Sequence, residues 1–346
     1  MPTSSIDTFF ACSLIVSVAL IATASFAGTM QTRIDNLQDA HKDEYLRTIA
    51  EQIVTMKGTP AEWGANAATI PTNFGLASNA ASYLYELDVD KVTRLNSQNN
   101  YALSYLQVLQ AAKLNNIALG ISLSQMLSIS VTLTANTTVG DATAYTFTVS
   151  ITYEQGPVNA SLHCYVIAKN FLTDIYNTTS RNGSGYISFQ IPNSSASAAL
   201  LVVFARASFD DRLTAYTVYS FPHLSQEPMP NNTFLELNPL NYTLNVNLKN
   251  PAVTVNKRYA FSYAYQANLT ATSNTTYVVP AFQDSSPIVL VVSGNNDTAY
   301  FNEWAAYPSV PFEFGGSFDS EKNVFVYIVV VKKTLYRLTI SFGDVA

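Results

Sequence analysis

Residues 9–27 read FFACSLIVSVALIATASFA, and residues 29–57 continue as TMQTRIDNLQDAHKDEYLRTIAEQIVTMK. The first stretch has no charged residue, and at about 1.5 Å per helical residue it is about 28 Å long, close to the hydrocarbon thickness of a bilayer. The second repeats apolar residues at spacings of three and four, as an amphipathic helix does. Only Gly28 interrupts the pair, so the sequence predicts one continuous helix over residues 1–57.

After this helix the sequence indicates first short helices and then strands. Lys57-Gly-Thr-Pro60 is typical of a helix end, and short helices are expected at residues 88–95, capped by Asp88, and at residues 99–113. From about Leu127, apolar and polar residues alternate with period two between turns rich in Gly, Asn, Ser and Pro, which indicates strands. The last two predicted strands form a hairpin that turns at Lys332-Lys333.

These patterns predict an α+β protein with a long N-terminal hydrophobic and amphipathic helix, short helices, and two immunoglobulin-like β-sandwich domains. The sequence from Pro222 to Asn232 is PHLSQEPMPNN, which is rich in proline, and residues 223–232 are predicted to form a linker. The expected domains are the helix (1–57), a small helical connector (58–125), a first sandwich (126–222), the linker (223–232) and a second sandwich (233–346).

Composition restricts the functional class. Charged residues make up 12% of the chain and the formal net charge is −6, with Lys and Arg scattered, so nucleic-acid binding is not expected. The two cysteines, Cys12 and Cys164, lie in the apolar helix and in a predicted strand, and we expect two buried free thiols rather than a disulfide.

Acceptor sequons for N-glycosylation are confined to the part of the chain after residue 130. Their density there favours a glycosylated, externally exposed C-terminal two-thirds, although strands rich in Asn and Thr also produce sequons by chance. The candidate acceptors are Asn136, Asn159, Asn177, Asn182, Asn193, Asn231, Asn241, Asn268, Asn274 and Asn296.

No catalytic or metal-binding motif is present, and we expect neither enzyme activity nor a cofactor or metal. The three histidines, His41, His163 and His223, are far apart in sequence and are not expected to converge. Trp63, Trp304 and the 21 tyrosines could form a sugar-binding platform, but packed sandwich cores explain them at least as well.

Small residues lie near one face of the apolar helix, and such residues let membrane helices approach closely. A plain single-pass anchor with the same residues fits equally well. Asp7, near the helix start, would pair with the N-terminal amine of a neighbouring subunit, or would lie in interfacial water. The candidate helix–helix assembly residues are Asp7, Ser13, Ser17, Ala24 and Gly28.

Signal-peptide cleavage is the main competing interpretation of the apolar stretch. Ser25-Phe-Ala27 before Gly28 satisfies the small-x-small rule for cleavage, as does Ala22-Thr-Ala24 before Ser25. The long apolar stretch and the lack of a basic segment before it count against cleavage.

The chain resembles archaeal type IV pilins and pilin-like cell-surface proteins over about residues 5–120. Besides the N-terminal helix, three segments carry the resemblance: Lys57-Gly-Thr-Pro-Ala-Glu-Trp63, Asn73-Phe-Gly-Leu-Ala-Ser78 and Leu87-Asp-Val-Asp-Lys-Val92. The resemblance implies that hydrophobic helices bundle into a filament core while the other domains face outward. Asp7 would then take the place of the acidic residue near the mature N-terminus of many bacterial pilins.

The sequence therefore predicts a structural subunit of an extracellular, pilus-like filament, located at the cell surface with its helix in the membrane or in the filament core. Its expected partners are copies of itself through the N-terminal helix, the membrane before assembly, and glycans. The alternative is a monomeric, membrane-anchored, glycosylated binding module or adhesin.

Overall fold

The structure is a computed structural model that describes residues 3–114, 116–225, 228–297, 299–316 and 323–344. The chain divides into two compact units, Met1–Glu51 and Gln52–Ala346, called here the helix unit and the β unit. Each is described by itself.

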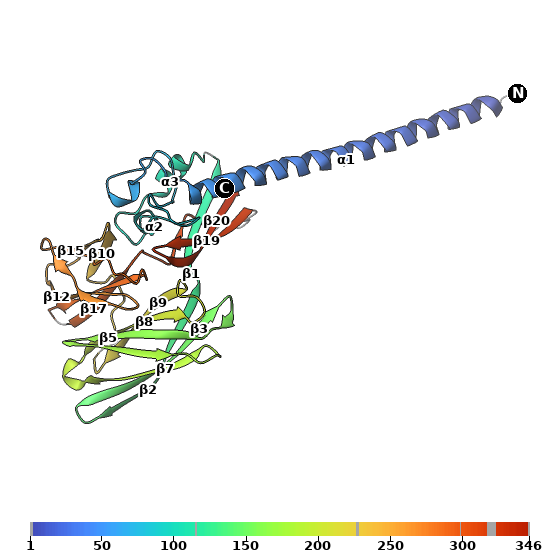
Figure 1. Ribbon diagram of the computed structural model, residues 1–346. Helices are drawn as coiled ribbons and strands as arrows, with labels where there is room; N and C mark the ends of the chain where they lie inside the picture. The colour runs from blue at the N-terminus through green and yellow to red at the C-terminus, as the bar shows by residue number, and fades with distance from the viewer. Residues whose placement is uncertain (1–2, 115, 226–227, 298, 317–322, 345–346) are drawn as a thin grey trace. The chain divides into compact units, whose positions relative to one another are not determined.

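Helix α1 (Thr3–Thr55) contains 53 residues and has no break at Gly28 (Figure 1). The predicted single N-terminal helix is confirmed, and at about 1.5 Å per residue it is about 80 Å long. It ends just before Gly58, whose φ of +74° and close neighbours suit only glycine, because an added Cβ would lie 2.7 Å from the carbonyl oxygen of Asn73.

The segment after α1 contains short helices: η1 (Trp63–Ala65), α2 (Val89–Thr93) and α3 (Tyr105–Ala112). The Asp88 cap is confirmed, since its carboxylate accepts hydrogen bonds of 3.0 Å from the backbone N–H groups of Asp90 and Lys91. The helix predicted at residues 99–113 starts only at Tyr105, because Ser104 forms a capping box with Gln107 and fixes the start there.

Two buried cations hold this segment together around the fully buried side chain of Trp63. The Lys91 ammonium donates to the carbonyl oxygens of Lys57 and Ala77, both at 2.8 Å. The Arg94 guanidinium centre lies 5.6 Å from the centroid of the Trp63 ring and donates to five backbone carbonyls. Burial lowers the pKa of both cations. The Lys91 and Arg94 side chains thus order this irregular segment by donating hydrogen bonds to its backbone carbonyl oxygens.

The described part of the β unit contains five sheets in which all strand pairs are antiparallel. The first sheet has β2 (Leu127–Val139), β3 (Ala142–Tyr153), β4 (Gly156–Pro157) and β7 (Ser184–Pro192). A short 3-10 helix, η2 (Asn193–Ser195), follows β7. The second has β6 (Phe171–Thr178), β5 (Ala160–Ala168), β8 (Ser197–Ala207) and β9 (Thr214–His223). The third has β13 (Gln266–Asn268), β12 (Val253–Phe261), β16 (Ile288–Asn296) and β17 (Ala299–Tyr307). The fourth has β10 (Leu235–Leu240), β11 (Thr243–Leu248), β15 (Thr276–Val278) and β14 (Thr270–Ala271).

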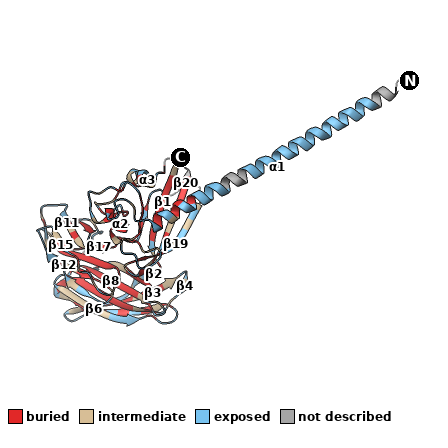
Figure 2. Ribbon diagram, turned by 45° about the horizontal axis from the view of Figure 1, so that its top comes forward, coloured by how far each residue is buried: buried red, intermediate tan, exposed pale blue. Residues whose placement is uncertain are grey.

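These four sheets pack face to face as successive layers (Figures 1 and 2). One apolar cluster lies between the first and second sheets, another between the second and third, and another between the third and fourth. Strand β8 shows the consequence, because Leu201 and Val203 belong to the first cluster while Leu200 and Val202 belong to the middle one. The two middle sheets are therefore buried on both faces.

The fifth sheet joins distant parts of the chain: β18 (Phe312–Phe314), β1 (Ile117–Gln125), β20 (Thr334–Asp344) and β19 (Asn323–Val331). The C-terminal hairpin is confirmed, since Val331 pairs with Thr334 and both turn residues, Lys332 and Lys333, have positive φ. Strand β1 falls where the sequence predicted a helical connector. The α+β class with sandwich-like sheets is confirmed.

Candidate functional site

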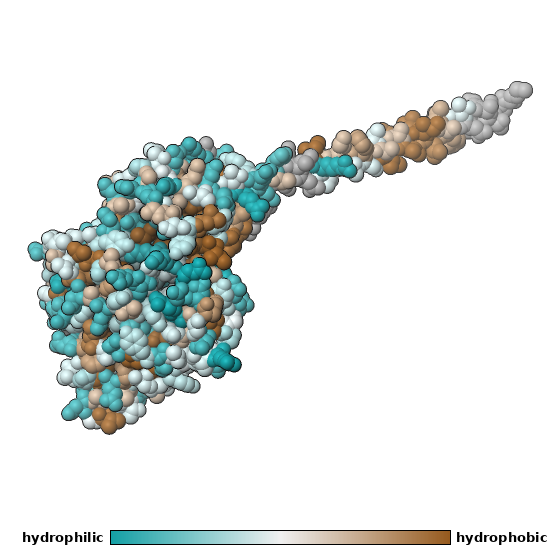
Figure 3. All heavy atoms as spheres, viewed as in Figure 1, coloured by the Kyte–Doolittle hydropathy of each residue, from teal (hydrophilic) through white to brown (hydrophobic). Residues whose placement is uncertain are grey.

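The first half of α1 is an exposed apolar surface. Residues Thr8–Ile34 form a segment long and apolar enough to cross a membrane or to act as a signal sequence, and none of its most apolar window is buried. Figure 3 shows this apolar surface as brown atoms along the N-terminal half of the helix. Phe9 is 73% exposed and Ile21 68%, so these side chains lack the apolar partners that a folded protein normally gives them.

The hydroxyls of Thr23 and Thr32 in this stretch are already hydrogen-bonded within the helix itself. The hydroxyl of Thr23 donates to the carbonyl oxygen of Ala19 at 2.9 Å, and that of Thr32 donates to the carbonyl oxygen of Gly28 at 2.9 Å. Such bonds remove the cost of placing a hydroxyl in an apolar environment. The segment is therefore suited to burial in lipid or among other helices.

The predicted small-residue face lies on this exposed surface. At about 100° per residue, Ser13, Ser17, Ala24 and Gly28 fall within about 60° of the helix circumference, and all four are exposed. A Cβ added at Gly28 would meet nothing within 4 Å, so the chain itself does not require glycine there. Asp7 lies in the part of α1 whose side chains are outside the described set, and its assembly role stays a prediction.

Most candidate glycosylation sites present an accessible asparagine. Asn193 and Asn296 are half-buried. The other eight are exposed: Asn136, Asn159, Asn177, Asn182, Asn231, Asn241, Asn268 and Asn274.

The sites differ in whether the acceptor amide nitrogen is already used. Asn177 donates to the carbonyl of Tyr186, and Asn193 donates to that of Gly140 at 3.1 Å. Asn231 donates to the carbonyl oxygen of Trp304 at 2.8 Å. The amide nitrogens of the remaining exposed sites have no hydrogen-bond partner among the described residues. Exposure together with an unbonded amide nitrogen therefore favours glycosylation at Asn136, Asn159, Asn182, Asn241, Asn268 and Asn274.

The two histidines of the β unit have separate packing roles. His223 is fully buried and bonds the hydroxyl of Tyr145 and the carbonyl oxygen of Pro192. His163 bonds the carbonyl oxygen of Tyr263, and its ring stacks on Tyr176 with centroids 3.7 Å apart. Within the described ranges, no group of three or more His, Cys, Asp or Glu side chains could hold a metal ion.

The cysteines agree only partly with expectation. Both are free thiols, as predicted, and Cys164 is buried in the first sandwich, where burial raises its pKa. Cys12 was also expected to be buried but is exposed, because the helix face around it has no partner within the chain.

Comparison with known proteins identifies no family. No protein-family model and no curated protein sequence matches the chain. Among solved structures, HBP35 of Porphyromonas gingivalis aligns at 11% identity and a TM-score of 0.20, over 52% of this chain and 63% of that one. Human GIVD cytosolic phospholipase A2 aligns at 7% identity and a TM-score of 0.15, over 66% of this chain and 33% of the enzyme. The chain thus spans less than two thirds of each, and similarities this weak carry no functional argument.

Proposed function

We propose that this protein is a structural subunit of an extracellular, pilus-like filament that assembles through α1. The observation that carries the proposal is the exposed apolar surface of residues 8–34. It presents eleven large apolar side chains that are each at least 47% exposed. At about 1.5–3 kcal/mol for each such side chain removed from water, their burial would contribute on the order of 15–30 kcal/mol, as an upper limit.

A bilayer and a bundle of helices would both bury this surface, and the small-residue face favours the bundle. Leucine-sized side chains hold neighbouring helices apart, whereas a run of serine, alanine and glycine lets their backbones approach. The continuity of α1 also favours an intact helix, because cleavage before Gly28 would cut within a regular helix. The resemblance to archaeal pilins points to the same function.

Two finer features belong to this proposal. The antiparallel, face-to-face sheets support an immunoglobulin-like class for the sandwiches. The six exposed acceptor asparagines whose amide nitrogens have no partner among the described residues support a glycosylated surface that faces the exterior.

The experiment that tests assembly is negative-stain electron microscopy of material sheared from cells, with N-terminal sequencing of this chain in it. Filaments that contain the chain with an intact α1 are expected. A monomeric membrane anchor predicts that the chain appears only in detergent-solubilised membranes, and a secreted protein predicts a soluble form that begins at Gly28 or Ser25. Either result would refute the filament proposal.

A matched pair of variants tests the small-residue face. Ala24→Leu places a leucine on that face, and Ala22→Leu makes the same change about 160° away around the helix. Overpacking a close contact costs about 1–3 kcal/mol, so Ala24→Leu and Gly28→Leu should each raise the subunit concentration needed for assembly by about fivefold or more. Equal assembly of Ala24→Leu and Ala22→Leu would exclude this face as the contact.

A further inference from the structure

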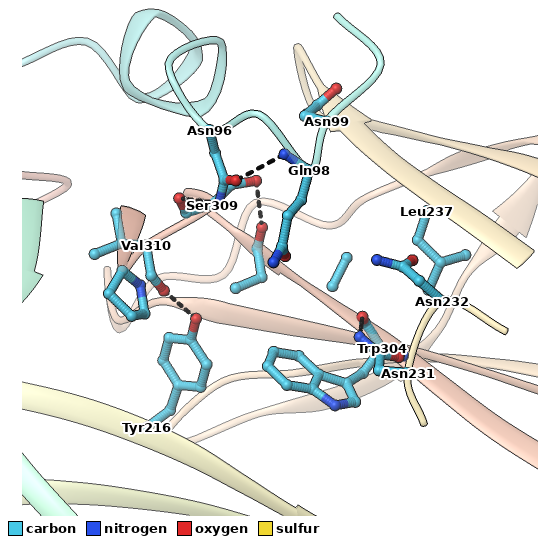
Figure 4. A pocket seen from close by; sticks show the side chains of 13 residues that line it. Asn96, Gln98, Asn99, Tyr216, Asn231, Asn232, Leu237, Trp304, Ser309 and Val310 are labelled. Atoms are coloured by element: carbon cyan, nitrogen blue, oxygen red, sulfur yellow. Dashed lines mark hydrogen bonds between the residues drawn. The ribbon is translucent and has the colours of Figure 1, made fainter. Parts of the chain in front are cut away.

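A cavity of about 370 Å³ opens in the β unit, where three stretches of chain meet. Its walls come from residues 96–99 before α3, residues 231–232 before β10, and residues 304–311 at the end of β17, with Tyr216 of β9 behind them. Figure 4 shows these side chains around a common space. The volume lies within the range of small-molecule sites, about 300–1,000 Å³.

One wall of the cavity is a fixed aromatic surface. The Trp304 ring is half-buried and meets the Tyr216 ring edge to face, with centroids 6.4 Å apart. The side chain of Asn231 holds the Trp304 backbone through two hydrogen bonds, 2.8 Å to its carbonyl oxygen and 2.9 Å from its N–H. The Tyr216 hydroxyl donates to the carbonyl oxygen of Val310. This wall is therefore set before any ligand arrives.

The opposite wall is built by two buried asparagines that use all their polar atoms within the protein. Asn96 donates to the carbonyl oxygen of Ser309 and accepts from the N–H of Gln98, both at 3.0 Å. Asn99 donates to the carbonyl oxygen of Pro239 at 3.0 Å and accepts from the N–H of Tyr101 at 2.9 Å. They fix the backbone on both sides of Gln98, whose side chain extends toward Trp304 in Figure 4.

Two hydrogen-bonding groups on these walls have no partner in the described parts of the chain. They are the side-chain amides of Gln98 and Asn232, which point into the space in Figure 4. Together they offer donors and acceptors around an aromatic face. A purely apolar ligand would leave these amides unpaired, which would weaken its binding.

The cavity lining contains no charged residue. A carboxylate or phosphate ligand would lose hydration there without gaining a counter-charge, so an acidic sugar or a nucleotide is disfavoured. A pyranose ring fits both requirements, because its C–H face packs on an aromatic ring while its hydroxyls bond amide groups. We propose that this cavity binds one neutral sugar residue, a hexose or an N-acetylhexosamine. The inference does not rest on filament assembly.

The chain is well suited to a fluorescence test because it has two tryptophans and Trp63 is fully buried. The full-length protein, in lipid nanodiscs free of sugar-based detergent, is titrated with methyl glucoside, methyl mannoside, methyl galactoside, N-acetylglucosamine and N-acetylgalactosamine, with glucuronate as the charged probe. A saturable change in emission is expected with at least one neutral sugar below about 100 mM, and glucuronate should bind at least about tenfold more weakly. Absence of saturation with all neutral probes would overturn the proposal.

Variants locate the binding. Gln98→Ala and Asn232→Ala should each weaken the responding sugar by about three- to tenfold, and Trp304→Ala should weaken it by about tenfold in calorimetry. Tyr186→Ala, which removes a 63% exposed aromatic ring on β7, should have no effect. Unchanged affinity in all three cavity variants would place any sugar site elsewhere and refute the assignment.

The same titration separates two sources of the sugar. If glycans on neighbouring copies occupy the cavity, enzymatic deglycosylation of the protein should increase its apparent affinity for the free sugar. If the ligand is an external saccharide, affinity should be the same before and after deglycosylation.

Discussion

Replacement of Arg94 tests the stability of the segment that follows α1. The side chain is 2% exposed and donates five hydrogen bonds, to the carbonyl oxygens of Trp63 (2.6 Å), Asn66 (3.0 Å), Ala67 (3.0 Å), Thr69 (2.7 Å) and Tyr101 (2.9 Å). Hydrogen bonds from a charged donor are worth about 1.5–3 kcal/mol each, but removing a buried cation also recovers several kcal/mol of its desolvation cost. We therefore expect Arg94→Met to lower the free energy of unfolding by about 3–5 kcal/mol.

Arg94→Lys tests whether the positive charge or the geometry of the guanidinium matters more. Lysine keeps the charge, but its ammonium has three N–H donors on one nitrogen, whereas the planar guanidinium has five. We expect it to lower the free energy of unfolding by about 1–3 kcal/mol. Arg181→Met, at an exposed arginine, is the control and should change it by less than about 0.5 kcal/mol. Denaturant unfolding followed by Trp63 fluorescence in a Trp304→Phe background measures all three. An Arg94→Met effect no larger than that of Arg181→Met would refute the reasoning.

Three further predictions concern the β unit. Burial lowers the pKa of Lys332 to about 8 from its ordinary 10.5, so between these values the unfolded chain holds more protons and stability should rise with pH, by at most about 1.4 kcal/mol per pH unit. Denaturant unfolding at pH 7 and 9.5 should show this rise, and Lys332→Met should lose it. The buried Glu303 carboxylate accepts from the N–H groups of Phe234 (2.6 Å) and Leu235 (2.8 Å). Glu303→Gln replaces one acceptor by a donor and should cost about 1–3 kcal/mol in a thermal or denaturant melt. Mass spectrometry of glycopeptides should find Asn136 modified and Asn231 unmodified. The Asn231 amide uses its oxygen and the N–H on the same side to pair with the Trp304 backbone, and an attached sugar would replace the hydrogen of that N–H. A fully occupied Asn231 would contradict that pairing.

Features set by neighbouring residues were predictable from the sequence. Helix α1 follows from an uninterrupted apolar and amphipathic pattern, and the turn at Lys332-Lys333 follows from two adjacent strand-like runs. The Asp88 cap depends only on the side chain and the next three residues. In each case the deciding contacts lie within a few positions along the chain.

The stacking of the sheets was missed although the sequence contained a signal for it. Residues 199–204 (ALLVVF) and 288–292 (IVLVV) are continuous apolar runs rather than alternating ones, as in strands buried on both faces. Two separate sandwiches would instead leave one face of each sheet polar. The pairing of β1 with β20 had no such signal, since it joins residues more than 200 positions apart.

The proposed sugar cavity could be foreseen only in part. Trp304 was a candidate for a sugar platform, but Gln98 and Asn232 lie in segments with no motif and reach the same space only through the fold. The roles of the buried Asn96 and Asn99, which fix the backbone around Gln98, could not be predicted from the sequence either. An asparagine that donates to a distant carbonyl oxygen has the same sequence pattern as one in an exposed turn. Sites of this kind require the tertiary contacts.

The segments Lys57–Trp63, Asn73–Ser78 and Leu87–Val92, on which the sequence resemblance to pilins was based, make packing contacts within the β unit. Gly75 is required because an added Cβ would lie 2.3 Å from the carbonyl oxygen of Met56, and Lys91 bonds the carbonyls of Lys57 and Ala77. None of these contacts involves the apolar half of α1. These segments therefore order the chain after the helix, whereas the proposed filament assembly would depend on the exposed face of residues 8–34. The two can be separated experimentally, because Gly28→Leu should raise the subunit concentration needed for assembly with Trp63 still buried, and Arg94→Met should loosen the packing around Trp63 while leaving the helix face intact.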